Sequence, residues 1–175
     1  LVGFPAGSSP DLSARVLTEP LSRALGQPVI VDNKPGASGN IAAEMLAKAT
    51  DDHTIGLLSV VNLTTARMLN PKLGYEPGDF APLTIVGTSP LILVAGAQLA
   101  AGTPADFLLE ARNAGEKWNY GSPGTGTVGH LGMELIKLKA SIRPMHIPFQ
   151  GVPQIINAMV GGQVQMALIP VGQAM

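Results

Sequence analysis

Apolar residues along the chain follow two alternating spacings, and this alternation predicts an α/β protein. Short apolar runs are typical of buried strands, whereas apolar residues that recur every three or four positions are typical of one helix face. The short runs predict strands at 1–4, 29–31, 54–59, 83–87, 91–95, 118–120, 144–148 and 164–169. The helical spacing predicts helices at 10–25, 40–49, 60–70, 103–114, 128–139 and 152–160. Because strands and helices alternate, we expect a parallel sheet with right-handed crossovers.

Capping and turn residues refine the ends of these elements. Ser9 is predicted to cap the first helix, and Gly26 is predicted to end it. Pro20 lies inside that helix and should kink or break it. Pro170 is predicted to open one more helix, which has barely begun at Met175.

The strand and helix pattern occurs twice, which indicates two lobes. A turn-rich stretch at 88–90 separates two strand-like runs, and we place the crossing between lobes there. We therefore expect a first lobe of residues 1–87 and a second lobe of residues 88–175. Because the chain starts inside a strand and stops early in a helix, we expect it to begin inside its first element and to end in mid-fold.

Composition narrows the function classes. The chain is 46% hydrophobic and 13% charged, which is typical of a well-buried α/β protein. The net charge of −1, without a basic stripe, argues against a nucleic-acid partner, and it means that local dipoles would have to hold an anionic ligand. The absence of cysteine excludes disulfides, thiolate zinc sites and cysteine nucleophiles. No apolar run is long enough to predict a membrane span.

Two loops carry the candidate chemistry, because each joins a predicted strand to a helix N-terminus. They are residues 4–11 and residues 120–130. Ligands of open α/β folds bind at this carboxyl edge of the sheet. Free N–H groups at a helix start, glycines that allow close approach and Ser or Thr hydroxyls together suit a carboxylate or a phosphate. The alternative interpretation is that both loops are only turns.

Nucleotide and catalytic motifs fit the sequence poorly. No Lys follows Gly126, so a P-loop is excluded. Residues 124–129 read G-x-G-x-x-G, yet the next strand lacks the acidic residue of a dinucleotide site. The chain contains no H-E-x-x-H zinc motif and no G-x-S-x-G nucleophile elbow. We therefore expect no enzyme activity, no cofactor and no metal.

Of four titratable residues, two have two possible interpretations each and two have one. His130 is either a capping and packing residue or a donor at a ligand cleft. Asp11 either complements the helix dipole or faces a ligand. His146 is interpreted as a packed strand residue, and His53 as an exposed loop residue.

An ordered series of short motifs runs along the chain. The first motif is Phe4-Pro5-Ala6-Gly7-Ser8-Ser9-Pro10-Asp11, and the most specific stretch is residues 26–37 followed by Gly39-Asn40-Ile41. The series continues in order through residues 70–71, 79–83, 119–122, 130–131, 134–135, 146–151 and 161–164. In its order and spacing it resembles one known family, the tripartite tricarboxylate transporter receptors, also called TctC-like or Bug proteins, whose first loop and helix start are similar to the first motif.

The resemblance implies a fold, a function and a set of site residues. The fold is the type II periplasmic-binding-protein architecture, an α/β two-lobe Venus flytrap, here without the C-terminal part of the first lobe. The implied function is capture of a small carboxylate between the lobes for a tripartite tricarboxylate-type transporter. The implied ligand-binding residues of the first lobe are Phe4, Ala6, Gly7, Ser8, Asp11, Ser59 and Asn62. Those of the second lobe are Ser122, Gly126, Thr127, His130 and Gln150.

The resemblance also implies a location and partners, and it leaves alternatives. We expect a periplasmic protein, with the signal peptide absent from this chain, that works with membrane transporter subunits. An incomplete first lobe would expose apolar surface and favour self-association. The alternatives are a ligand sensor of the same fold for a signalling kinase, an enzyme that uses the Gly-rich loop for a phosphate-bearing cofactor, and a truncated, non-functional remnant. The first loop reads Ala6-Gly7-Ser8 where the family usually has two glycines, and 169–171 is apolar where many members are acidic.

Overall fold

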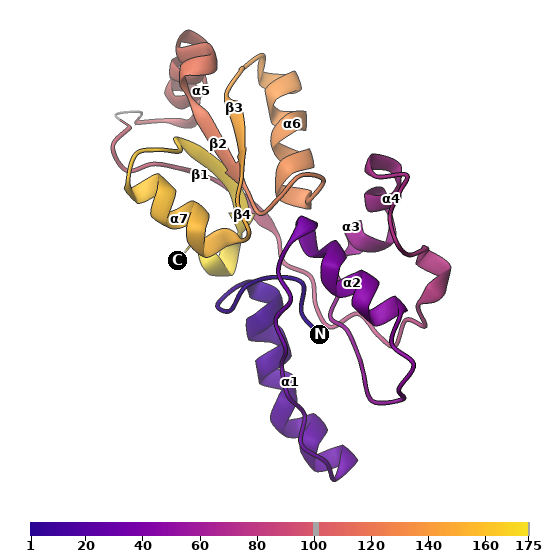
Figure 1. Ribbon diagram of the computed structural model, residues 1–175. Helices are drawn as coiled ribbons and strands as arrows, with labels where there is room; N and C mark the ends of the chain where they lie inside the picture. Colours follow the sequence, from indigo (N-terminus) through magenta and orange to yellow (C-terminus); the bar gives the residue numbers. More distant parts are fainter. Residues whose placement is uncertain (100–101, 175) are drawn as a thin grey trace. The chain divides into compact units, whose positions relative to one another are not determined.

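The computed structural model describes residues 1–99 and 102–174 and separates into two compact units, Leu1–Thr88 and Ser89–Met175 (Figure 1). The α-helices are α1 (Ser9–Leu25), α2 (Asn40–Ala47), α3 (Val60–Leu63), α4 (Thr65–Leu69), α5 (Pro104–Ala114), α6 (Val128–Ala140) and α7 (Val152–Val160). The strands are β1 (Leu91–Ala95), β2 (Asn119–Ser122), β3 (Met145–Pro148) and β4 (Met166–Pro170). Short 3-10 turns are η1 (Ala37–Gly39), η2 (Pro77–Asp79), η3 (Gly115–Lys117) and η4 (Val171–Gln173).

The second unit is a sheet with helices on both faces. Its strand order is β1-β4-β2-β3, with β2 parallel to both neighbours and β1 antiparallel to β4. Side chains of β4 alternate between the faces: Met166 and Leu168 pack with α5 and α6, whereas Ala167 and Ile169 pack with α7. This period of two is what a strand buried on both faces requires.

Two glycines let the helices of this unit approach the sheet closely. A methyl group at Gly129 in α6 would lie 2.7 Å from the carbonyl oxygen of Leu168, so the first turn of α6 rests directly on β4. A methyl group at Gly121 in β2 would lie 2.8 Å from the Ile155 side chain of α7. The N-terminus of α6, and with it the loop that precedes α6, is therefore held against the sheet.

The first unit has three extended segments joined by isolated bridges. Val2 pairs in parallel with Asn33 and with Leu57, and none of the three segments forms a longer ladder. The strands expected at 1–4 and 54–59 are therefore reduced to single bridges, because neither run has a neighbour that pairs along its length. The carboxyl ends of these parallel segments lead into the first loop, into the 34–39 turn and into α3. The polar groups that follow each segment therefore lie at the same end of the three paired segments.

Local signals explain where α1 begins and ends. Its N-cap residue is Ser8 rather than the expected Ser9, and Pro10 lies in the first turn. Gly26 ends the helix in a left-handed conformation with φ 66°. The helix continues through Pro20, which is exposed, so water can reach the carbonyl that loses its donor.

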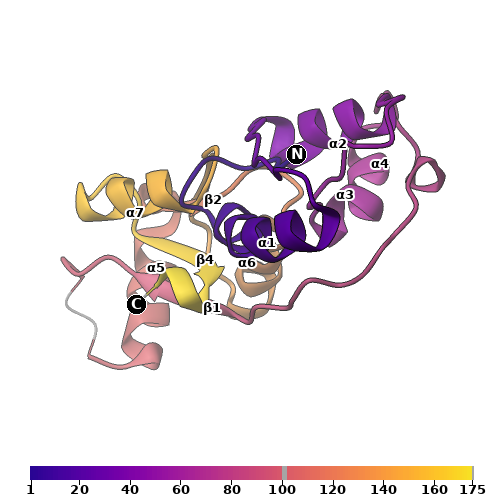
Figure 2. The ribbon, with the colours of Figure 1, turned by 90° about the horizontal axis from the view of Figure 1, so that it is seen from below.

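Several expected elements are absent or shorter. Residues 83–87 form no strand, and Leu83 and Ile85 are 81% and 83% exposed (Figure 2). The run 29–31 is not a strand either, and Ile30 is 82% exposed. An apolar run becomes a strand only where a neighbour pairs with it, and the run itself does not specify that neighbour.

Two further elements differ in their extent. The helix expected at 60–70 breaks at Thr64, where φ −126° and ψ −80° are not helical, and gives α3 and α4. Pro170 ends β4 and is followed by the short turn η4 rather than by an α-helix. Met175 lies outside the described residues.

Candidate functional site

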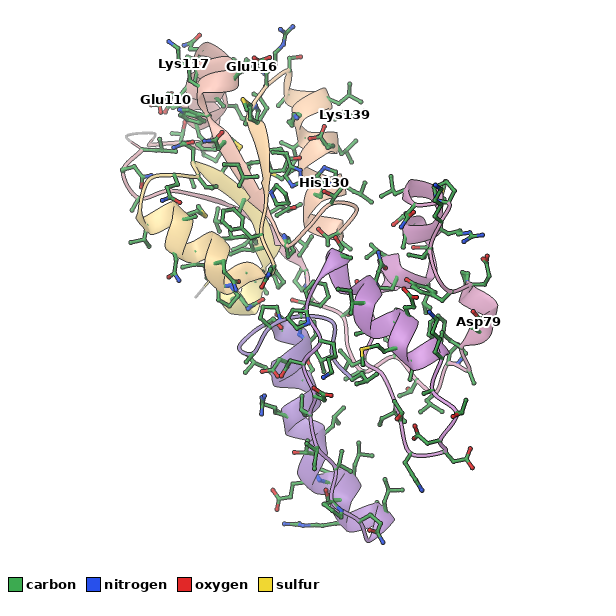
Figure 3. The ribbon with its side chains drawn as sticks, viewed as in Figure 1. Asp79, Glu110, Glu116, Lys117, His130 and Lys139 are labelled. Atoms are coloured by element: carbon green, nitrogen blue, oxygen red, sulfur yellow. The ribbon has the colours of Figure 1, made fainter. Side chains whose placement is uncertain are left out.

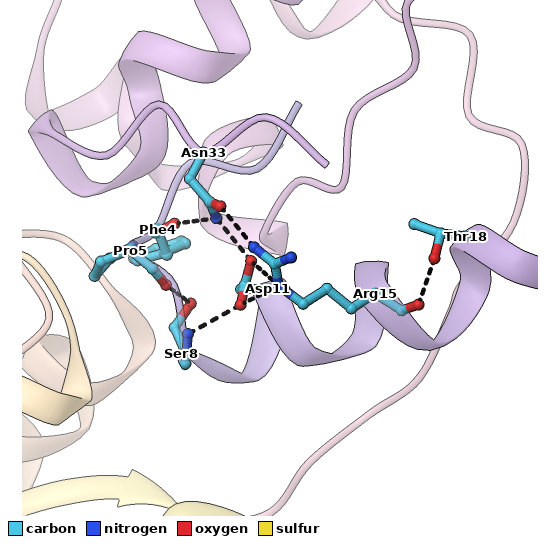
Figure 4. Close-up of polar contacts among 8 residues, drawn as sticks. Phe4, Pro5, Ser8, Asp11, Arg15, Thr18 and Asn33 are labelled. Carbon is cyan, nitrogen blue, oxygen red and sulfur yellow. Dashed lines mark hydrogen bonds and ion pairs between the residues drawn. The ribbon is translucent and has the colours of Figure 1, made fainter. Parts of the chain in front are cut away.

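The first loop of the first unit is a tight turn between an extended segment and α1 (Figure 4). The Ser8 hydroxyl donates to the Pro5 carbonyl at 2.7 Å, and the Ser8 amide donates to the same carbonyl at 3.2 Å. Gly7 has φ 81°, a left-handed conformation that a side chain would strain. Ala6 and Gly7 are exposed, whereas Phe4 and Ser8 are buried. The turn therefore presents its tip to solvent while its base is packed.

The buried side chain of Asp11 holds this turn in place through hydrogen bonds. Its carboxylate is 1% exposed and accepts hydrogen bonds from the Gly7 amide at 2.9 Å, from Arg15 Nε at 3.0 Å and from Asn33 Nδ2 at 2.9 Å. The Arg15 hydrogen bond lowers the pKa of Asp11 below its usual value, and this outweighs burial, which acts in the opposite direction. The carboxylate is thus an internal anion that organises the loop.

Asn33 joins the first loop to the next segment. Its Nδ2 also donates to the Phe4 carbonyl at 2.9 Å, and its Oδ1 accepts from Arg15 at 3.3 Å. Asn33 was not among the expected site residues. Its position at the carboxyl end of the second extended segment, beside the first loop, was the signal that could have found it.

A second polar cluster of this unit surrounds Asn62. Asn62 Oδ1 accepts from the Ser59 amide at 3.0 Å, and Nδ2 donates to Asn40 Oδ1 at 2.8 Å. The Tyr75 hydroxyl lies 2.7 Å from Asn40 Oδ1 and 2.9 Å from the Asn62 carbonyl. A methyl group placed on Gly39 would lie 3.3 Å from the Phe4 ring and 3.4 Å from the Asn62 side-chain amide, so this cluster adjoins the first loop.

The Gly-rich loop of the second unit is held by its own hydroxyls. Thr127 caps α6, accepting from the His130 amide and donating to the Gly124 carbonyl at 2.7 Å. The Ser122 hydroxyl accepts from the Gly124 amide at 3.2 Å. Ser122 and Thr127 are buried, whereas Thr125 at the loop tip is exposed. Gly124 and Gly126 adopt φ 123° and 82°, which favours glycine at both positions.

Three aromatic rings stack behind this loop. The centroids of His130 and His146 are 4.2 Å apart, and those of His146 and Tyr120 are 4.8 Å apart. His130 lies in the first turn of α6 (Figure 3) and accepts from the Gly126 amide at Nδ1, 3.1 Å away. His146 Nε2 lies 2.7 Å from the Ser122 hydroxyl. The stack therefore contacts the loop at both ends.

The stack has a charged pair at its edge. The Tyr120 hydroxyl donates to Glu134 at 2.5 Å, and Lys137 lies 2.7 Å from the same carboxylate. Burial lowers the pKa of His130, and burial followed by the charge of His130 lowers the pKa of His146 to about 4. Both imidazoles are therefore neutral at pH 7.

The expected residues form one group in each unit. The group of the first unit is Phe4, Ala6, Gly7, Ser8, Asp11, Ser59 and Asn62. The group of the second unit is Ser122, Gly126, Thr127, His130 and Gln150, and the exposed Gln150 follows β3, whose Pro148 pairs with Ser122. Sequence reasoning missed Asn33, Asn40 and Tyr75, and it treated His146 as packing only.

Both loops lie at helix N-termini, whose positive dipole end suits an acid group. In this structure the amides of Gly7, Ser8, Gly124 and Gly126 donate within their own units. Within the described residues there is no cluster of His, Asp or Glu able to hold a metal ion. None of the helices in residues 1–99 and 102–174 has the length and apolarity that crossing a membrane requires.

Several known proteins are similar to this chain in sequence and in fold. A "UPF0065 protein in tcbD-tcbE intergenic region" of Pseudomonas sp. (strain P51) is 33% identical over 170 residues, 96% of this chain and 50% of that protein. The solved structure of MatC (Rpa3494) from Rhodopseudomonas palustris with bound malate has 30% identity and a TM-score of 0.90, covering 99% of this chain and 60% of that one. The structure of R. palustris Rpa4515 with adipate has 29% identity and a TM-score of 0.92, covering 99% and 59%.

The chain spans about half the length of the curated relatives it matches. The solved structures are matched over nearly the whole of this chain and confirm the expected periplasmic-binding-protein fold. The family described as "Tripartite tricarboxylate transporter family receptor" matches residues 13–175. This chain therefore belongs to the tripartite tricarboxylate transporter receptor family.

Proposed function

We propose that this protein is a periplasmic receptor that captures a small organic carboxylate and passes it to a tripartite tricarboxylate-type membrane transporter. The observation that carries the proposal is the Gly-rich loop at the N-terminus of α6, where amide and hydroxyl groups meet at the carboxyl edge of parallel strands. Two similar proteins of solved structure hold malate and adipate, which supports a carboxylate as the ligand.

In this proposal the acid group is bound by main-chain donors and hydroxyls instead of by a cationic side chain. Hydrogen bonds to a charged group contribute about 1.5–3 kcal/mol each. A few of them, made by amides that are already oriented, would bind a small acid without overall electrostatic attraction from a chain of net charge −1. The helix dipole of α6 adds to this attraction.

The expected site residues then divide by role. The exposed Ala6 and Gly7 of the first loop and Gln150 are proposed to meet the ligand directly. Asp11 and Asn62, whose side chains are occupied internally, are proposed to shape the site. The remaining residues are proposed to line it: Phe4, Ser8, Ser59, Ser122, Gly126, Thr127 and His130. Ligand capture is proposed to involve binding without a chemical step.

Calorimetric titration with aliphatic mono- and dicarboxylic acids, adipate and malate among them, tests the proposal. We expect at least one acid to bind and its neutral diamide not to bind, because the diamide lacks the charge. Absence of heat with every acid, or equal affinity for acid and diamide, would contradict a carboxylate receptor.

A pair of matched variants assigns the binding to the Gly-rich loop. Gly126→Ala and Gly26→Ala both place a side chain at positive φ, 82° and 66°, and so carry a similar strain of about 1 kcal/mol. Only Gly126 belongs to the proposed site, whereas Gly26 ends α1 with open space around it. We expect Gly126→Ala to weaken acid binding about tenfold or more and Gly26→Ala to leave it unchanged.

A further inference from the structure

The two imidazoles of the second unit contact the Gly-rich loop through different atoms. His130 Nδ1 accepts from the Gly126 amide at 3.1 Å, so the proton of the neutral ring is on Nε2. His146 Nε2 lies 2.7 Å from Ser122 Oγ, which in turn contacts both the amide and the carbonyl of Gly124. One imidazole thus holds the end of the loop at Gly126, and the other holds its beginning at Ser122.

Ring contacts join these two attachments: His130 and His146 pack with their planes tilted by 32°, and His146 stacks on Tyr120 at 20°. His146 is the middle ring, because its centroid lies 4.2 Å from His130 and 4.8 Å from Tyr120, whereas His130 and Tyr120 are 6.4 Å apart. Tyr120 is fully buried and ties the stack to the sheet. Two positive rings cannot share such close contact in a partly buried position, so the stack favours uncharged imidazoles.

We propose that His130 and His146 are positioning residues of the Gly-rich loop, whose stacked, uncharged imidazoles hold Gly126 and Ser122 in the conformation that receives the carboxylate. This inference rests on the proposed function. Protonation of His130 would turn Nδ1 into a donor that faces the Gly126 amide, another donor. The bond would be lost, and Gly126 would no longer be held by His130, whereas Thr127 would still hold the Gly124 carbonyl.

The groups around the imidazoles determine whether His130 is protonated at a given pH. Glu134 and Lys137 face His130 from its own helix, Tyr120 faces it from β2 and His146 from β3. Glu134 raises the pKa of His130 and Lys137 lowers it, whereas burial, the largest effect, lowers it. The neutral, loop-holding form is therefore the form present at pH 7, and acid converts it.

Substitutions at position 130 distinguish the effect of losing the hydrogen-bond acceptor for Gly126 from the effect of protonating the imidazole. His130→Asn keeps an oxygen near the place of Nδ1 but cannot be protonated, whereas His130→Leu removes the acceptor. His53→Asn is the matched control, since His53 is an exposed turn residue of the first unit. At position 146, His146→Gln keeps a polar group for Ser122 and His146→Leu does not.

Nitrogen NMR and calorimetry with adipate measure the consequences. At pH 7.5 we expect His130 to carry its proton on Nε2 alone, and we expect the Gly126 amide signal to follow the titration of His130 as the pH is lowered. We expect His130→Leu and His146→Leu to bind adipate about tenfold more weakly, a loss of about 1.4 kcal/mol. His130→Asn and His146→Gln should restore most of the affinity.

The dependence of adipate affinity on pH distinguishes this positioning role from a purely structural one. Affinity of the wild type and of His53→Asn should fall further between pH 7.5 and 5 than affinity of His130→Asn, and protonation of adipate itself cancels in this comparison. A proton on Nδ1 of His130, a Gly126 amide that ignores His130, or wild-type affinity in His130→Leu would overturn the inference. If no acid binds the wild type, the proposed function fails, and the NMR titration still decides whether the imidazoles hold the loop.

Discussion

Asp11→Asn removes one negative charge from beneath the first loop while changing the size of the side chain very little. The native carboxylate accepts from Gly7, Arg15 and Asn33 and is 1% exposed. Asparagine keeps one acceptor oxygen, but its NH2 group must face one of these three donors. The substitution therefore creates a buried conflict between donors and leaves Arg15 without its anion.

The loss of stability expected for Asp11→Asn follows from these contacts. A hydrogen bond to a charged group contributes about 1.5–3 kcal/mol, and removing one partner of a fully buried ion pair costs about 3–5 kcal/mol. Arg15 is half exposed, so water partly replaces its lost partner. We expect Asp11→Asn to lower the free energy of unfolding by about 2–4 kcal/mol.

Urea unfolding followed by circular dichroism measures this loss, and the same helix supplies the control. Glu19 and Arg23 form an ion pair in α1 with the same four-residue spacing, but both side chains are exposed. Glu19→Gln should therefore change the stability by no more than about 0.5 kcal/mol. Equal effects of the two substitutions would refute the internal role of Asp11.

Acid provides a second check on the same residue. Because the folded-state pKa of Asp11 is lowered, its contribution is complete above the unfolded value of 3.8 and is lost as the pH falls through the folded-state pKa. The stability difference between the wild type and Asp11→Asn should therefore shrink at low pH. A difference that stays constant would contradict this assignment.

Three further predictions concern the second unit. Tyr120→Phe removes the hydrogen bond to Glu134 and should cost about 1–2 kcal/mol in urea unfolding, and the raised pKa of Tyr120 means that tyrosinate absorbance at its position appears only on unfolding. His146 gives the stability a pH dependence, because its pKa is 6.5 in the unfolded chain and about 4 in the folded chain. The free energy of unfolding of the wild type should therefore fall by up to about 3 kcal/mol between pH 6.5 and 4. The fall should be smaller in His146→Gln. Gly129→Ala meets the Leu168 backbone and should destabilise more than Gly132→Ala, which meets only the end of the Leu168 side chain; equal thermal midpoints would refute the close approach of α6.

Sequence reasoning located the second unit more accurately than the first. The helices at 104–114, 128–140 and 152–160 lie within a residue or so of their expected ranges, because capping residues and apolar spacing are local signals. The runs at 29–31 and 83–87 were expected as strands and are not, because strand formation depends on a partner distant in sequence.

Local sequence patterns indicated the two candidate loops, whereas they could not indicate the side chains that contact each loop from positions distant in sequence. Both loops were identified from glycine, serine and threonine beside helix starts, which are neighbours in sequence. The contacts of Asn33 with Phe4 and of His146 with Ser122 join residues 29 and 24 positions apart. No local pattern encodes such contacts, and only the parallel register of the segments brings them together.

The central claim is that the Gly-rich loop at the N-terminus of α6 binds an acid group. Titrating nitrogen-labelled protein with adipate or malate, while following the amide signals of residues 122–127, tests it most directly. We predict that these signals shift together and yield one dissociation constant that agrees with calorimetry. Unchanged signals of residues 122–127 in the presence of an acid that binds by calorimetry would contradict the account.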